Sequence, residues 1–215
     1  MYKWILKNDN IEIRKISLVA FIGASEAGKT TAEDLILELS EPEEGHVLVD
    51  GVDICTNMAA WHQKIGYIPQ TIYLMDDTIK ANIAFGVDEV DIDETRIQKA
   101  LKEAQLDEFI TQLPEGIHTE IGDRGIKLSG GQRIGIARAL YRNPEVLILD
   151  EATSALDNDM EKEVMEAIDS IHGTRTLIVI AHRLTTIQNC DFIYEVKDSK
   201  IIERKYEEIF KMGSN

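Results

Sequence analysis

The feature that most constrains the fold of this chain is the eight-residue run Gly23-Ala24-Ser25-Glu26-Ala27-Gly28-Lys29-Thr30. The residues just before it, 18–22, are all apolar, which is typical of a strand buried on both faces of a sheet. The residues after it are predicted to form a helix that begins near Lys29. The run therefore fits the pattern G-x-x-x-x-G-K-[ST] between a strand and a helix, the context that this pattern requires.

A loop of this kind holds phosphate groups. Its successive N–H groups surround a phosphate at the N-terminus of a helix, where the helix dipole is positive. Lys29 is then expected to reach the β- and γ-phosphates of a nucleotide, and the Thr30 hydroxyl is expected to hold Mg²⁺. The predicted nucleotide-binding residues of this loop are Gly23, Ala24, Ser25, Glu26, Ala27, Gly28, Lys29, Thr30 and Thr31.

Two acidic residues, Asp150 and Glu151, follow the apolar run 146–149. A buried strand delivers its last residues to the edge of the sheet where ligands bind in open α/β folds. Adjacent acids are usually solvated turn residues, but a phosphate loop upstream favours a catalytic pair. Asp150 is therefore a candidate Mg²⁺ ligand, and Glu151 is a candidate general base that activates water.

A second cluster of small residues, Ser129-Gly130-Gly131-Gln132, precedes a helical pattern at 133–142. It provides another helix N-terminus with exposed N–H groups, to which Ser129 adds a hydroxyl. Taken singly, most such runs are flexible hinges. In a chain that also carries a phosphate loop, we interpret Ser129, Gly130, Gly131 and Gln132 as a second anion-binding site.

Strand and helix patterns alternate along the rest of the chain. Strands are predicted at residues 11–16, 18–22, 46–51, 65–68, 146–149, 176–181, 192–196 and 200–202. Helices are predicted near residue 29, with Leu35, Ile36 and Leu39 on the buried side, and at 78–85, 94–104, 106–113, 132–142 and 158–171. The alternation is interrupted by a block of helices, which predicts a parallel-sheet core that carries a helical insertion.

The ordered motifs closely resemble the nucleotide-binding domain of ABC transporters. The resemblance rests on the runs 128–132, 138–140 and 150–157, and it extends from about residue 5 to residue 209. It implies an α/β fold: a P-loop NTPase (RecA-like) core with a mostly parallel sheet, an N-terminal antiparallel β region and an inserted α-helical subdomain. Residues 1–70 and 143–215 are expected to form the core, and residues 71–142 the helical subdomain.

The resemblance also assigns roles along the chain. Gln70 corresponds to the Q-loop glutamine, which contacts Mg²⁺ and the attacking water, and Asp157 ends the D-loop. His182 corresponds to the H-loop histidine, which holds the γ-phosphate and positions Glu151. Domains of this family pair head to tail, so the phosphate loop of one and residues 129–132 of the other enclose each ATP. The stretch 120–125 resembles the one with which exporter-type domains sense their transmembrane partner.

The charge balance restricts the partners. The chain has 39 Asp and Glu residues against 23 Lys and Arg residues, a net charge of −16, which disfavours nucleic-acid partners and broad docking onto anionic lipid. Its two cysteines, Cys55 and Cys190, are expected to be free thiols in a reducing cytosol. No apolar run reaches the roughly 18–20 residues of a membrane-spanning helix, and no signal peptide is recognised. We predict a cytoplasmic location at the cytoplasmic face of a membrane, reached through a partner without direct membrane insertion.

Three features depart from the family pattern. Glu26 stands where the family usually has glycine, so its charge and its resistance to positive φ predict weakened ATP affinity. The N-terminus is short, which leaves Tyr2 as the candidate for stacking on adenine. Asp9 and Ile16 replace an apolar residue and a turn glycine, which predicts a rebuilt β region.

The leading hypothesis is an ATP-binding and ATP-hydrolysing motor domain of an exporter-type ABC transporter. Its cofactors are ATP and Mg²⁺, and its partners are a second nucleotide-binding domain, identical or different, and transmembrane domains. One alternative is a nucleotide-responsive dimerisation module with weak or no turnover, because of Glu26 and the short N-terminus. Another is a soluble ABC ATPase outside transport. Whether the chain is part of a fused transporter or a separate subunit stays open at this point.

Overall fold

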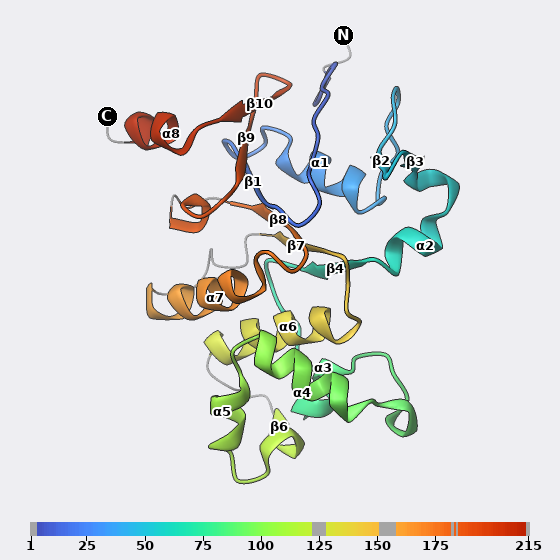
Figure 1. Ribbon diagram of the computed structural model, residues 1–215, viewed down its shortest axis with the longest axis vertical. Helices are drawn as coiled ribbons and strands as arrows, with labels where there is room; N and C mark the ends of the chain where they lie inside the picture. Colours follow the sequence, from blue (N-terminus) through green and yellow to red (C-terminus); the bar gives the residue numbers. More distant parts are fainter. Residues whose placement is uncertain (1–3, 122–127, 151–157, 182, 184, 214–215) are drawn as a thin grey trace.

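Figure 1 shows the computed structural model, which describes residues 4–121, 128–150, 158–181, 183 and 185–213. Its centre is a six-stranded sheet with the strand order β10-β9-β1-β8-β7-β4. Every neighbouring pair in this sheet is parallel except β9 and β10, so the predicted mostly parallel sheet is confirmed. The strands are β1 (Leu18–Ile22), β4 (Ile65–Ile68), β7 (Val146–Asp150), β8 (Thr176–Ile180), β9 (Phe192–Lys197) and β10 (Lys200–Arg204).

Helices cover both faces of the sheet because its central strands are apolar on both faces. Val19 and Phe21 of β1 lie in one buried cluster, on the side of helix α1 (Lys29–Ile36). Leu18 and Ala20, which alternate with them, lie in a second cluster with residues of α6 (Leu128–Tyr141) and α7 (Asn158–Ile171). In Figure 1 these two helices accordingly lie on the opposite side of the sheet from α1.

The helical block packs beneath the sheet, where Figure 1 shows it in green and yellow. It contains α3 (Ile79–Ile83), α4 (Glu94–Glu103), α5 (Asp107–Thr111) and the short turns η2 (Glu89–Asp91) and η3 (Gly116–His118). The helices predicted at 78–85, 94–104 and 106–113 are therefore present, each slightly shorter. A short antiparallel pair of β5 (Asp77–Thr78) and β6 (Glu120–Ile121) closes this block; it was not predicted, because its strands contain only two residues each.

The remaining elements are short. The expected strand at 46–51 is a hairpin of β2 (Leu48–Val49) and β3 (Val52–Asp53), an antiparallel pair in the N-terminal part of the chain. The others are η1 (Ile54–Thr56), α2 (Met58–His62), η4 (Thr185–Ile187) and α8 (Tyr206–Gly213). None of the helices in the described part of the chain has the length and apolar character needed to cross a membrane.

The prediction of a strand at residues 11–16 is wrong, because side chains rather than a backbone ladder fix the N-terminal segment. Tyr194 donates its hydroxyl hydrogen to the Glu12 carbonyl at 2.9 Å, and the Ile201 N–H donates to Asp9 Oδ1 at 2.9 Å. Lys200 Nζ donates to the Asn8 carbonyl at 3.0 Å. These contacts satisfy groups that a ladder would have paired. They also explain Asp9, whose carboxylate accepts a hydrogen bond from the edge strand β10.

Ile16 adopts a left-handed backbone conformation with a φ of 61°. A branched side chain in this region costs about 1–2 kcal/mol, a cost that glycine avoids. The side chain is 53% exposed and so recovers little by burial. Ile16, which stands in place of a turn glycine, is therefore a site of local backbone strain at the entry to β1. Its N–H donates to Thr176 Oγ1 at 3.0 Å, which helps to hold this conformation.

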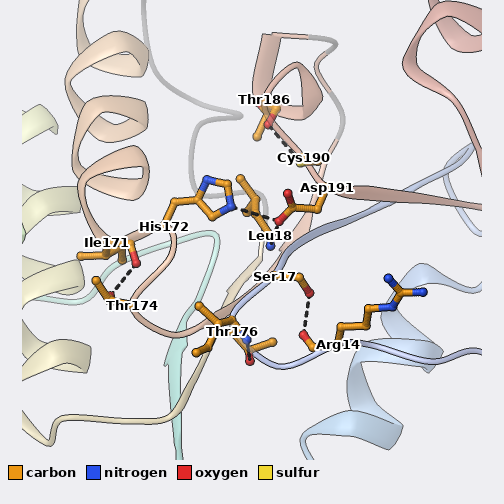
Figure 2. Close-up of polar contacts among 11 residues, drawn as sticks. Arg14, Ser17, Leu18, Ile171, His172, Thr174, Thr176, Thr186, Cys190 and Asp191 are labelled. Carbon is orange, nitrogen blue, oxygen red and sulfur yellow. Dashed lines mark hydrogen bonds and ion pairs between the residues drawn. The ribbon is translucent and has the colours of Figure 1, made fainter.

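Asp191 fastens the start of β1 to the loop that follows α7 (Figure 2). Its Oδ2 accepts the Leu18 N–H at 2.8 Å and lies 3.0 Å from His172 Nε2. Partial burial disfavours the charged carboxylate, but the hydrogen bonds from Leu18 and His172 outweigh this effect and lower the pKa of Asp191. The contact holds the beginning of β1, so that its other end leads into the phosphate loop in a fixed position.

Candidate functional site

The loop between β1 and α1 is compressed from two sides. A Cβ atom on Gly23, which has a φ of 151°, would lie 2.4 Å from the Val196 carbonyl oxygen of β9. A Cβ atom on Gly28, which has a φ of 111°, would lie 3.0 Å from Ile5 Cγ2 of the N-terminal segment. Both glycines are therefore required by geometry, as the strand–loop–helix pattern predicts.

Several backbone N–H groups of this loop make no hydrogen bond to the described part of the protein. Within the described residues, the N–H groups of Ser25, Glu26 and Gly28 donate to no protein acceptor, whereas Ala27 donates to the Ala24 carbonyl at 3.2 Å. Gly28 is the N-cap of α1 and has no side chain with which to cap it. Unpaired N–H groups at a helix N-terminus form an anion-binding site.

Lys29 lies over the loop and is only 6% exposed. Its Nζ donates to the carbonyls of Gly23 at 2.9 Å and Ala24 at 3.1 Å. The ammonium group is therefore already held beside the N–H groups that would receive a phosphate. Of the hydroxyl residues that follow, Thr30 is exposed and Thr31 is half-buried.

Helix α1 buries two charged residues, which the sequence reasoning did not anticipate. It predicted Leu35, Ile36 and Leu39 as the buried side, but Leu39 is 69% exposed because the helix ends at Ile36. The buried residues of the helix are instead Lys29, Ala32 and Glu33, and Glu33 is 3% exposed. The signal available in the sequence was the spacing of Lys29 and Glu33, which places both on one face of the helix.

Tyr67 connects Glu33 to the end of β7. It lies opposite Ile148 in the parallel pairing of β4 and β7, so Tyr67, Ile148 and Asp150 share one face. Ile148 belongs to the cluster packed on the α1 side. Burial, the charges of Glu33 and Asp150, and a side-chain hydrogen bond to Glu33 raise the pKa of Tyr67 well above its ordinary value. The hydroxyl is therefore protonated at neutral pH, and it is hydrogen-bonded to Glu33.

Gln70 is exposed and directly follows the β4 region. Its backbone carbonyl accepts a hydrogen bond from Gln132 Nε2 at 3.3 Å, and Gln132 is 9% exposed. The prediction that this helix begins only after the small-residue run is wrong, since α6 begins at Leu128. Residues 129–132 therefore lie at its N-terminal end, where the N–H groups of Ser129 and Gly130 are among the first of the helix and have no intrahelical acceptor.

Four predicted site residues, Tyr2, Glu151, Asp157 and His182, lie outside the described residues. The strand β7 ends at Asp150, immediately before Glu151, and buried Ala181 immediately precedes His182. The roles assigned to these four residues remain predictions.

The oxygen donors of the site suit Mg²⁺. Thr30, Gln70 and Asp150 provide a hydroxyl, an amide and a carboxylate, and Mg²⁺ prefers oxygen ligands. No group of three or more His, Cys, Asp or Glu side chains in the described part of the chain forms a preformed metal site.

The mostly parallel sheet, the helices on both of its faces and the loop at residues 23–30 define the P-loop NTPase fold. The family model described as "ABC transporter" matches residues 6–154. The chain therefore belongs to the ABC transporter family and has the fold of its ATP-binding domain.

Individual relatives agree with this assignment. The chain is 42% identical over 213 residues to an ATP-dependent lipid A-core flippase of Francisella novicida, covering 97% of this chain and 36% of the flippase. It is 41% identical to the heterocyst differentiation ATP-binding protein HepA of a Nostoc species, covering 96% and 34%. It resembles the structure of a bacterial Atm1-family ABC exporter with ATP bound, with a TM-score of 0.82, 38% identity and coverage of 97% and 37%. The chain thus spans about a third of the length of these relatives.

Proposed function

We propose that this chain is the ATP-binding and ATP-hydrolysing motor domain of an exporter-type ABC transporter, located at the cytoplasmic face of a membrane. The observation that carries the proposal is the loop at residues 23–30, where unpaired N–H groups meet the buried ammonium of Lys29. The likeness to exporters over nearly the whole chain supports the transport role. In this assignment, residues 1–70 and 143–215 form the core and residues 71–142 the helical subdomain.

Residues 23–31 bind the phosphates of ATP. The N–H groups of the loop and Lys29 neutralise the β- and γ-phosphates, and Tyr2 stacks on the adenine. Thr30, Asp150 and Gln70 hold Mg²⁺, which when bound offsets phosphate charge. Glu151 takes a proton from the attacking water, and His182 holds Glu151 and the γ-phosphate in position. The loop donors are fixed before ATP arrives, so little reorganisation opposes the reaction.

A second nucleotide-binding domain completes each site. Ser129, Gly130, Gly131, Gln132 and Asp157 of one domain face the phosphate loop of the other in a head-to-tail pair. The Gln132 hydrogen bond to the Gln70 carbonyl supports a link between the two motifs. A change at Gln70 in one nucleotide site is thereby passed to the helix that contributes to the other.

The transmembrane domains dock beside the stretch that follows Gln70. Tyr73 is 85% exposed and Phe85 is 50% exposed. Arg138 of α6 lies over the Phe85 ring at 5.1 Å and donates to the Tyr73 carbonyl at 2.9 Å. Burial lowers the pKa of Arg138, which nevertheless stays charged. This arrangement joins an exposed aromatic surface to α6, so a partner bound there is coupled to the nucleotide-binding residues of that helix.

Glu26 favours one alternative, a dimerisation module with weak turnover. It is exposed and has a φ of 64°, the left-handed conformation that opposes a non-glycine residue at this position. Its charge also lies in the loop that binds phosphates. This observation lowers the expected ATP affinity without removing any proposed catalytic group.

Replacing Glu26 with glycine should tighten ATP binding by about three- to tenfold, because the substitution removes a negative charge from the loop that binds the phosphates. Titration of ATP against the wild type and the variant measures the change. Glu26→Gln serves as the matched control, since it removes the charge but keeps the left-handed backbone, and it should give a similar gain in affinity. Equal affinities of all three proteins would show that Glu26 does not weaken the site.

Association in the presence of nucleotide tests the paired arrangement. The Glu151→Gln variant with ATP and Mg²⁺ should sediment as a dimer, and it should sediment as a monomer with ADP. Adding Ser129→Arg should prevent the dimer, because a long cation would occupy the site of a phosphate-binding hydroxyl. A monomer at saturating ATP contradicts head-to-tail pairing, whereas a dimer from a wild type without turnover favours the dimerisation module.

A further inference from the structure

Helix α1 places a second buried charge next to the phosphate loop. Lys29 is 6% exposed and Glu33 is 3% exposed. Residues four apart are neighbours on a helix surface, and helical side chains lean toward the helix N-terminus. The Glu33 carboxylate is therefore directed toward the turn that carries Lys29, which is the turn that opens onto the loop.

The Glu33 carboxylate also interacts with Tyr67 of strand β4. The register of β4 and β7 puts Tyr67 beside Ile148, and Asp150 is the next residue of β7 on the same face. The hydroxyl of Tyr67 is hydrogen-bonded to Glu33, and the charges of both Glu33 and Asp150 act on it. Glu33 and Tyr67 thus form a hydrogen-bonded pair, and Asp150 at the end of β7 lies on the same face of the sheet as Tyr67.

The effect of Glu33 on nucleotide binding depends on the net charge of the ligand that enters the loop. A buried carboxylate interacts with nearby charges through a medium that screens them less than water does. Glu33 therefore repels the phosphates of a nucleotide that enters the loop, and it attracts a cation that enters with them. The repulsion is larger for a free nucleotide than for its complex with a divalent cation, because the cation cancels two negative charges.

We propose that Glu33 is a positioning residue that makes nucleotide binding depend on the divalent cation, with Tyr67 holding its carboxylate in place. Glu33 does not touch the reacting atoms; it acts through Lys29 and through the surroundings of Asp150. This inference rests on the proposed function, since it concerns the same nucleotide site.

The test compares ADP binding with Mg²⁺ and with EDTA by isothermal titration calorimetry. Glu33→Gln, which keeps the size of the side chain, should raise the affinity for ADP in EDTA by about tenfold. It should change the affinity for ADP in Mg²⁺ by less than about threefold. Glu44→Gln, which removes an exposed acidic residue outside α1, is the matched control and should leave both affinities unchanged.

Glu33→Ala provides a second variant if the glutamine variant does not fold, and the same pair of changes is expected from it. Equal changes with Mg²⁺ and with EDTA, or no change in either, would overturn the inference. Such a result leaves the proposed function intact, because the wild type would still bind ADP. If the wild type binds no nucleotide under either condition, the proposed function itself fails.

Discussion

Replacing Lys29 with alanine should weaken ATP binding by about 100-fold or more. Lys29 is 6% exposed, and its ammonium is held by the carbonyls of Gly23 and Ala24 beside the N–H groups proposed to bind phosphate. A charge-assisted hydrogen bond contributes about 1.5–3 kcal/mol, and a loss of about 3 kcal/mol corresponds to roughly 100-fold in affinity. Titration of ATP against wild type and variant measures the loss.

Two controls make this result specific. Lys197→Ala removes an exposed cation at the end of β9 and should leave the affinity unchanged, which separates a local effect from a change in net charge. Urea unfolding of Lys29→Ala shows whether the fold survives. An affinity within about threefold of the wild type in a folded variant would mean that the lysine does not bind the nucleotide, contrary to the proposed role.

Gly23→Ala should lower the free energy of unfolding by about 3 kcal/mol, the combined cost of a left-handed backbone and a steric clash. The added Cβ would lie 2.4 Å from the Val196 carbonyl oxygen, so either the loop or strand β9 must move. Because this movement alters the contact that positions the phosphate loop, ATP binding should weaken as well. Urea denaturation measures the first effect, and titration of ATP measures the second.

Gly45→Ala is the matched control for this substitution. Gly45 also has a positive φ, 94°, but a Cβ there would meet no atom within 4 Å. Its replacement should cost only the backbone term, about 1 kcal/mol, and should leave ATP binding unchanged. Equal losses of stability in the two variants would show that contact with β9 does not constrain the phosphate loop.

The central strands and the phosphate loop were predictable because their signals are local. The apolar runs at 18–22 and 146–149 form β1 and most of β7, and the glycines of the loop have the backbone geometry that the motif requires. The segment 11–16 was not predictable in the same way. Its alternation is typical of a strand, but its Glu12 carbonyl is paired with the side chain of Tyr194, which is distant in the sequence.

The contact between Glu33 and Tyr67 was not predicted from the sequence, for a similar reason. Glu33 and Tyr67 come together only because β4 pairs with β7 in one register and α1 packs on that face. Nothing near either residue in the sequence specifies that contact. The roles of Gln70, Asp157 and His182 came from the family resemblance alone, because the position of a single polar residue in a sequence does not indicate a chemical role.

Hydrolysis of ATP by the purified chain tests the central claim most directly. The wild type with Mg²⁺ should release phosphate from ATP, and Glu151→Gln should reduce the rate by about 100-fold or more, the usual contribution of a general base, while ATP binding is retained. Equal rates in the two proteins, or no turnover by a wild type that binds ATP, would contradict the assignment of this chain as an ATP-hydrolysing motor domain.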